Sequence, residues 1–298
     1  MRSPEQNSSN TALIERYLQY LRLERRYSEN SVSAVKRDLA LVSQAVDVVT
    51  SQDLKLLLAK RHASGSAPAS LARAASSWRG FFSFLLKEQL IQANPALGLK
   101  TPKLARSLPK AVGVDQLLAL LQGDLPLEFR FAQAHVLVEL LYCTGLRISE
   151  ALSLDEKILS GTSELRVVGK GNKARIVPII DNLSQRLAQF AAIRQIHLAS
   201  KSIGGTPSLF VSGKGVNLSV RQAQKDVADY AKLKGLDQHL HPHMLRHSFG
   251  SHLLQGTQNL RAVQELLGHA SIASTQVYTA LDFDHLSSVY DKTFPRAR

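Results

Sequence analysis

Residues 71–86, LARAASSWRGFFSFLL, carry the clearest helical period of the chain. Large apolar side chains return every three or four positions, so that one face of a helix would be continuously apolar. The aromatic residues Trp78, Phe81 and Phe82 fall on that face. The pattern therefore predicts that they form the core of a helical unit.

Three more helices are expected before this stretch. Apolar stripes run through residues 13–21 and 32–46, and Thr50 and Asp53 have the spacing of a capping box ahead of a third apolar stretch. Together, the four helices predict a compact unit that ends near Leu90.

Residues 94–111 have a different character. Pro95, Pro102 and Pro109 are spread along them without helical periodicity, which is typical of an extended linker. Four basic residues lie among these prolines: Lys100, Lys103, Arg106 and Lys110. This composition indicates that the linker also follows a polyanion.

The rest of the chain, residues 112–298, mixes helices with one hairpin. Residues 128–143 are apolar on most sides, as in a buried helix, and the Thr-Gly pair at 144–145 should end that helix. The period then changes to two on both sides of residues 169–173, which predicts a β-hairpin with a Gly- and Lys-rich turn.

Single residues mark two more helix starts. Asp115 has the side chain of an N-cap residue and predicts a short helix that ends at Leu121. Pro242 fits the first position of another helix, because a proline there loses no hydrogen bond. The second part is therefore expected to be mainly α with a small sheet.

The charge of the chain is strongly positive. Its 298 residues hold 37 Lys and Arg against 24 Asp and Glu, a formal net charge of +13. Residues 1–110 hold 17 basic and 8 acidic residues, whereas residues 111–298 hold 20 and 16. The excess either gives a basic surface with no specific role or marks an N-terminal domain that contacts phosphates.

Several protein classes are excluded by composition. Cys143 is the single cysteine, so no intramolecular disulfide can form. No apolar run approaches the roughly 18 residues of a membrane-spanning helix. The first residues lack the apolar core of a signal peptide. We therefore expect a cytoplasmic protein without membrane insertion.

Two candidate site residues lie where the chain turns. Arg147 follows the break at 144–145, where it could hold an anion beside free helical amides or simply pair with Glu150 on the surface. Lys170, with Lys173 and Arg175 close by, lies in the hairpin turn. Turn lysines are commonly solvated, but glycine neighbours also suit an arm that reaches a phosphate. The turn does not have P-loop spacing.

The densest cluster is HPHMLRH at residues 241–247. His243 and Arg246 are three positions apart and share a helix face. His243 and His247 have the i, i+4 spacing of a zinc helix, but the acidic residue of that motif is missing and Arg246 places a positive charge between them. We therefore expect no metal and no other cofactor.

His269 and Tyr278 complete the candidate set. Taken alone, such a histidine is commonly a capping or core residue, and such a tyrosine is commonly a packing residue. Together with two arginines and a lysine they suit phosphodiester chemistry. A phenol can attack phosphorus while a histidine moves its proton, arginines neutralise the non-bridging oxygens, and a lysine protonates the leaving 5′ oxygen.

Five motifs follow one another in the order found in the tyrosine recombinases (phage-integrase family). They are TGLRISE at 144–150, VGKGNK at 168–173, HMLRH at 243–247, LLGH at 266–269 and QVY at 276–278. The chain resembles this family over nearly its whole length, and within it the bacterial Xer recombinases. Three further segments look more like the XerC branch than the XerD branch: 261–267, 281–283 and 294–298. One departure is Ala280, where relatives often have a histidine.

The resemblance implies a role for each candidate. They are Tyr278 as nucleophile, Arg147 and Arg246 as a clamp on the scissile phosphate, His243 as general acid and base, Lys170 as general acid for the leaving group, and His269 as a residue that orients the phosphate.

The resemblance also implies a fold. It is a mainly α protein of two domains that form a clamp around DNA. A helical core-binding (SAM-like) DNA-binding domain would span 1–93, a linker 94–111, and an α+β catalytic domain with a small β-hairpin sheet 112–298.

The implied partners are a double-stranded DNA recombination site, a XerD-like recombinase in a heterotetramer, and an FtsK-like translocase as regulator. The implied task is to resolve chromosome dimers and plasmid multimers. Three alternatives stay open at this point: a phage, integron or transposon integrase of the same family, a type IB topoisomerase, and a non-catalytic DNA-binding protein.

Overall fold

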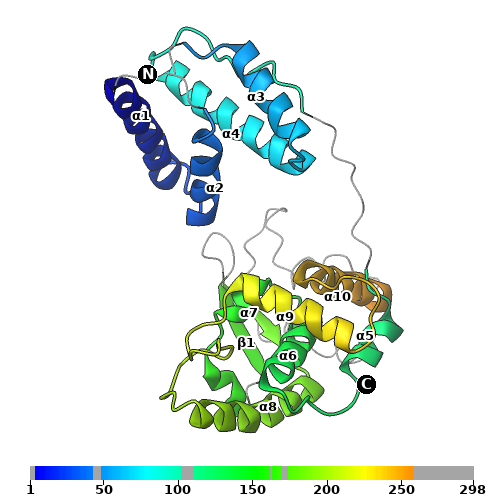
Figure 1. The fold of residues 1–298 in the computed structure, drawn as a ribbon. Helices are drawn as coiled ribbons and strands as arrows, with labels where there is room; N and C mark the ends of the chain where they lie inside the picture. The colour runs from blue at the N-terminus through cyan, green and yellow to red at the C-terminus, as the bar shows by residue number, and fades with distance from the viewer. Residues whose placement is uncertain (1–3, 43–47, 102–110, 162, 169–173, 258–298) are drawn as a thin grey trace. The chain divides into compact units, whose positions relative to one another are not determined.

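The computed structural model describes residues 4–42, 48–101, 111–161, 163–168 and 174–257. The chain divides into two compact units, Met1–Ser107 and Leu108–Arg298, each traced in Figure 1. Three of the candidate site residues, Lys170, His269 and Tyr278, lie outside the described residues. Within the described ranges, no helix has both the length and the apolar character that crossing a membrane requires.

The first unit contains four helices, as the sequence predicts. They are α1 (Pro4–Leu23), α2 (Glu29–Leu39), α3 (Ser51–Ala63) and α4 (Pro68–Lys87). The second helix is shorter than its apolar stripe, which continues to Val46. It ends at Leu39 because the next two residues turn, with the N–H groups of Leu41 and Val42 donating to carbonyls three positions back.

The expected capping box starts α3. The Thr50 hydroxyl accepts the N–H of Asp53 at 3.2 Å, and the Asp53 carboxylate accepts the N–H of Thr50 at 2.9 Å. Two of the N–H groups that a helix start leaves without a partner are thereby satisfied.

A buried polar contact joins α2 to α4. Asp38, 3% exposed, accepts hydrogen bonds from Arg73 Nη1 at 2.6 Å and from the Ser77 hydroxyl at 2.8 Å. The indole N–H of Trp78 donates to the Asp38 carbonyl at 2.8 Å. Trp78, Phe81 and Phe82 are buried, so the prediction that these aromatics form the core is confirmed.

The first residues of the predicted linker pack against the first unit. Ala96 and Leu99 are buried in the core of the first unit, and the Asn94 side chain accepts the N–H of Ala96 at 2.8 Å. Residues 94–99 therefore pack against the helices, although they lack helical periodicity. The boundaries of the two functional domains, 1–93 and 112–298, stay predictions.

The second unit is built around α6 (Phe129–Thr144), which is buried along almost its entire length, as predicted. It packs against α8 (Asp181–Ser200), α9 (Val220–Leu233) and α10 (Pro242–Thr257) (Figure 1). The remaining elements are, in chain order, α5 (Val114–Leu121), α7 (Ile148–Leu152), the 3-10 helix η1 (Glu156–Ser160), β1 (Glu164–Val168) and β2 (Ala174–Pro178).

One predicted cap is wrong. Helix α5 begins one residue before Asp115, and its N-cap is Gly113, whose N–H donates to the side chain of Gln116 at 3.2 Å. Asp115 instead adds an acidic side chain to the first helical turn, where the helix dipole favours it. The start of α10 at Pro242 is as predicted.

The predicted hairpin is present as an antiparallel pair of strands. Val167 lies opposite Arg175, and Leu165 lies opposite Val177. Opposite residues point to the same face of the sheet, and this face packs against the core because Leu165, Val167 and Val177 are buried. Arg175 therefore shares the inward face, whereas Arg166 is exposed on the other face.

Candidate active site

The turn between α6 and α7 positions Arg147. Gly145 ends α6 in the left-handed conformation, with φ of 61°, and its N–H donates to the Leu141 carbonyl at 3.0 Å. Glycine adopts this conformation at little cost, which explains why the Thr-Gly pair stops the helix. The chain then reverses, and Arg147 becomes the N-cap residue of α7.

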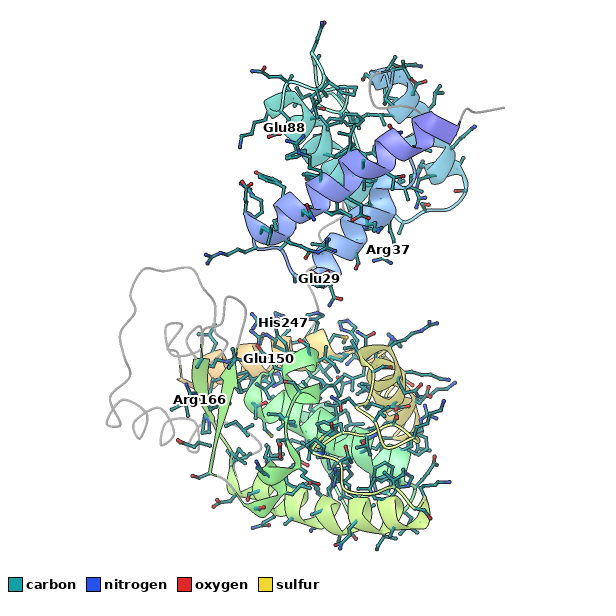
Figure 2. All side chains as sticks on the ribbon, turned by 90° about the vertical axis from the view of Figure 1, so that its left-hand side faces the viewer. Glu29, Arg37, Glu88, Glu150, Arg166 and His247 are labelled. Atoms are coloured by element: carbon teal, nitrogen blue, oxygen red, sulfur yellow. The ribbon has the colours of Figure 1, made fainter. Side chains whose placement is uncertain are left out.

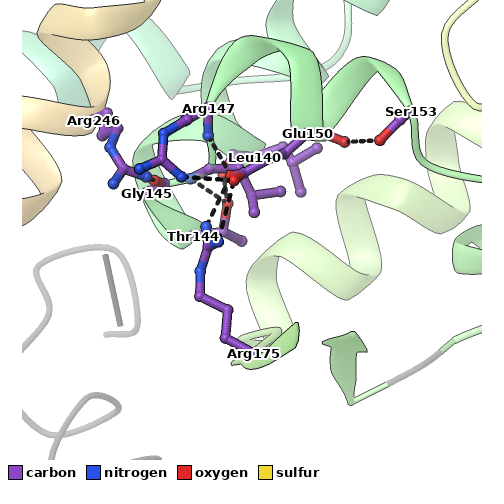
Figure 3. Close-up of polar contacts among 9 residues, drawn as sticks. Leu140, Thr144, Gly145, Arg147, Glu150, Ser153, Arg175 and Arg246 are labelled. Atoms are coloured by element: carbon purple, nitrogen blue, oxygen red, sulfur yellow. Dashed lines mark hydrogen bonds and ion pairs between the residues drawn. The ribbon is translucent and has the colours of Figure 1, made fainter. Parts of the chain in front are cut away.

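Glu150 binds two arginines that come from different elements (Figure 3). Its carboxylate accepts the backbone N–H of Arg147 at 2.8 Å and Nη1 of the same arginine at 2.8 Å. Arg175 of β2 donates Nη2 to Oε2 at 2.8 Å and Nη1 to Oε1 at 3.2 Å. The pairing of Arg147 with Glu150 is thus present, but the glutamate is only 7% exposed and does not belong to a solvated surface.

These contacts fix the charge of Glu150. Burial alone would raise the pKa of its carboxyl group, but the hydrogen bonds from Arg175 and Arg147 outweigh burial and lower the pKa from 4.5 to about 2. Glu150 therefore carries a full negative charge at neutral pH.

Arg246 reaches the same turn from α10. Its Nη1 donates to the carbonyl of Gly145 (Figure 3). Burial, together with the positive charges of Arg147 and Arg175, lowers the pKa of its guanidinium to about 10, against an opposing effect of Glu150. Arg246 still carries its charge at neutral pH. The structure thus brings together two of the candidate residues, Arg147 and Arg246, although they are 99 positions apart in the sequence.

His243 lies on the same helix, one turn before Arg246, and its side chain is exposed. The ring of His241 accepts the N–H of Met244 at 3.3 Å and so caps the start of this helix. His247, labelled in Figure 2, is exposed as well. Over the part of the chain that the structure describes, no three His, Cys, Asp or Glu side chains group as metal ligands. That the protein uses no metal remains a prediction.

Two buried polar residues hold α10 in place. The Ser248 hydroxyl accepts the backbone N–H of Val112 at 2.9 Å. The hydroxyl of Tyr142 on α6 lies 3.0 Å from Nδ1 of His252. Both side chains lie on the inward side of the helix that carries His243 and Arg246, so they fix its position.

No role was predicted from the sequence for Ser248 or His252. The inward orientation of Arg175 was not predicted either. The available signal for the arginine was the alternation of the strand, because Arg175 stands two positions before the buried Val177. For Ser248 and His252, the signal was a polar side chain on the apolar side of a helix. Neither pattern identifies the residue that the side chain contacts.

Two protein-family models match this chain. The model described as "Phage integrase family" matches residues 113–285, and "Phage integrase, N-terminal SAM-like domain" matches residues 14–89. The chain belongs to the phage integrase family. The fold class predicted from the sequence, mainly α with an N-terminal helical domain and a catalytic domain with a small sheet, is confirmed in its elements.

Curated relatives place the chain more narrowly. It is 42% identical over 294 residues to the tyrosine recombinase XerC of Azotobacter vinelandii, covering 96% of each chain. It is 44% identical over 296 residues to XerC of Chromobacterium violaceum, covering 96% of this chain and 95% of that one. The protein is therefore a tyrosine recombinase of the Xer type, most like XerC.

Solved structures share its fold at lower identity. A lambda integrase (residues 75–356) dimer bound to a COC′ core site has a TM-score of 0.65 at 18% identity, covering 90% of this chain and 98% of that chain. The XerH recombinase bound to palindromic difH substrate has a TM-score of 0.60 at 21% identity, covering 92% and 82%.

Proposed function

We propose that this XerC-like recombinase cuts and rejoins DNA through a 3′-phosphotyrosyl intermediate at a double-stranded recombination site. The observation that carries the proposal is the convergence of Arg147 and Arg246 on the turn at Gly145. Two fixed cations at one turn suit a single phosphate, whose two non-bridging oxygens gain charge as phosphorus is attacked.

The two arginines differ in their setting. Arg147 keeps 34% of its side chain exposed, so part of its guanidinium can face a ligand. Arg246 is more deeply placed and loses more hydration, as the lowering of its pKa to about 10 indicates. A partly desolvated cation attracts a phosphate more strongly than one in bulk water, because the local dielectric is lower.

The remaining roles rest on the family motifs. In this proposal, the Tyr278 oxygen attacks phosphorus and leaves a free 5′ hydroxyl, His243 moves the tyrosine proton, Lys170 protonates the 5′ oxygen, and His269 orients the phosphate. Fixed cations do the electrostatic work, so no metal is required.

The assembly is also a proposal. Domains 1–93 and 112–298 would clamp the duplex, two copies of this chain would join two XerD-like subunits in a heterotetramer, and an FtsK-like translocase would regulate exchange. The task would be to resolve chromosome dimers and plasmid multimers in the cytoplasm. The support is the 42% identity to XerC over 96% of the chain.

The test of the chemistry uses Tyr278→Phe and a nicked suicide substrate. Wild-type protein should form a covalent adduct that survives a denaturing gel, whereas the variant should bind DNA normally and form none, because phenylalanine has no nucleophilic oxygen. An adduct in the variant would assign the nucleophile to another residue. EDTA should leave the wild-type reaction intact.

The test of the partnership uses the organism's own chromosome-dimer resolution site. Footprints with and without the XerD-like partner should show two adjacent half-sites, with this chain on one of them. Equal occupation of both half-sites by this chain alone would contradict the heterotetramer.

A further inference from the structure

Arg175 directs both terminal nitrogens of its guanidinium at Glu150. Each donates to a different carboxylate oxygen, at 2.8 Å and 3.2 Å. Its side chain is only 12% exposed, on the inward face of β2. A side chain held in this way has little freedom to bind a ligand itself.

The contact between Arg175 and Glu150 changes the balance of charges at the turn. Glu150 also accepts two hydrogen bonds from Arg147, the arginine proposed to hold the scissile phosphate. If Glu150 were paired with Arg147 alone, its negative charge would cancel the charge that the phosphate needs. With Arg175 in place, three arginines face one carboxylate, so two positive charges remain.

We propose that Arg175 is a positioning residue that compensates the charge of Glu150 and so preserves the positive charge that Arg147 and Arg246 present to the phosphate. This inference rests on the proposed recombinase chemistry and adds a residue to it. Arg175 acts through Glu150 and does not touch the DNA.

The geometry explains why a carboxylate is present at all. Glu150 accepts the backbone N–H of Arg147, so it fixes the start of α7 and the direction of the Arg147 side chain. Without this contact the Arg147 side chain would be mobile. A guanidinium that is held in position stabilises a transition state more strongly. With Arg175 present, Glu150 can hold Arg147 in position without cancelling the positive charge that the phosphate needs.

Two other roles of Arg175 would predict different experimental results. A direct contact with DNA would make its loss harmful whether or not Glu150 is charged. A purely structural role, tying the hairpin to α7, would lower folding stability and harm every function equally. Charge compensation makes the effect of Arg175 depend on Glu150 and slows cleavage without lowering folding stability or DNA affinity.

The experiment is a double-mutant cycle in the full-length protein. The variants are Arg175→Gln, Glu150→Gln and the double variant, with Arg166→Gln as matched control, since Arg166 lies on the same hairpin but on the exposed face (Figure 2). The readout is the rate of covalent adduct formation on the suicide substrate at saturating DNA, together with DNA affinity and circular dichroism.

Arg175→Gln should slow adduct formation by about tenfold or more with little change in DNA affinity, because only the transition state feels the lost charge. In the Glu150→Gln background the same change should cost less than about threefold, because no carboxylate is left to compensate. Arg175→Lys, which keeps the charge but loses the fork, should fall between wild type and Arg175→Gln. Arg166→Gln should match wild type.

Equal losses in both backgrounds would overturn the inference. If Arg175→Gln does not fold, the comparison of Glu150→Gln with the double variant decides alone, and a large loss there contradicts it. Absence of an adduct with wild-type protein is a different failure, since it removes the proposed recombinase chemistry. Wild-type adduct formation with an equally active Arg175→Gln removes only the role of Arg175.

Discussion

The backbone N–H of Val112 donates to the hydroxyl of Ser248 at 2.9 Å, so the first residues of the second unit are tied directly to α10. Both residues are fully buried. Because α10 carries Arg246 and His243, this hydrogen bond connects the entry of the chain into the second unit with the helix that bears two proposed site residues.

Ser248→Ala should destabilise the second unit by about 1–3 kcal/mol, because the buried N–H of Val112 would lose its acceptor. The two units can be followed separately in denaturant. Trp78 is the single tryptophan and lies in the first unit, so its fluorescence follows that unit, whereas circular dichroism follows both.

The expected result is an unchanged fluorescence transition and a circular dichroism signal that changes at lower denaturant. Ser200→Ala is the control, because that hydroxyl donates to the His197 carbonyl in an exposed position and its loss should cost less than about 0.5 kcal/mol. A fluorescence transition that moves with Ser248→Ala would contradict separate unfolding.

Asp38→Ala should destabilise the first unit by about 1–3 kcal/mol. The substitution removes the acceptor of Arg73 and of the Ser77 hydroxyl at a site that is 3% exposed. Asp38→Asn should cost less, because its amide oxygen still accepts one hydrogen bond. Here the fluorescence of Trp78 is the measurement, and the prediction fails if both variants unfold at the same denaturant concentration as wild type.

The ionisation of Glu150 should make the free energy of unfolding depend on pH in the acid range. Its pKa is lowered from 4.5 to about 2 in the folded protein, so its ionised form stabilises the fold above the unfolded pKa. That contribution should be complete above about pH 5 and should disappear as the pH falls through the folded pKa near 2.

The measurement is the free energy of unfolding of wild type and Glu150→Gln between pH 7 and pH 2. The difference between the two proteins should stay constant in the upper part of this range and narrow below the unfolded pKa. Glu164→Gln is a matched control on an exposed carboxylate. A difference that widens in acid would mean that the arginines do not stabilise the ionised form.

Sequence periodicity was sufficient for most of the fold. The buried helix α6, the strands on both sides of residues 169–173 and the capping box at Thr50 follow from local patterns, because caps, turns and amphipathic faces are set by neighbouring residues. The packing of residues 94–99 was missed for the same reason. A segment without a repeat can still pack, and burial of Ala96 and Leu99 depends on helices far away in the chain.

In the candidate site, too, local patterns predicted some features and tertiary contacts determine the others. Arg147 and Arg246 were chosen from motifs, but their meeting at Gly145 is a tertiary contact. The partner of Arg175 lies 25 positions away, and that of Ser248 lies 136 positions away. No local pattern encodes such pairs, so the charge balance around Glu150 could be obtained only from the folded chain.

The last prediction concerns Lys170 as the proton donor to the 5′ oxygen. An alkoxide is a poor leaving group, so Lys170→Ala should slow cleavage by about 10²–10⁴-fold. Replacing the bridging 5′ oxygen by sulfur removes the need for a proton, because a thiolate with a pKa of about 8.5 leaves unaided. The sulfur substrate should therefore restore much of the cleavage rate of Lys170→Ala. It should restore Arg147→Ala and Arg246→Ala far less, because the non-bridging oxygens still need their cations. Equal rescue of all three variants, or no rescue of Lys170→Ala, would give the proton transfer to another group, and Lys173 would be the next residue to test.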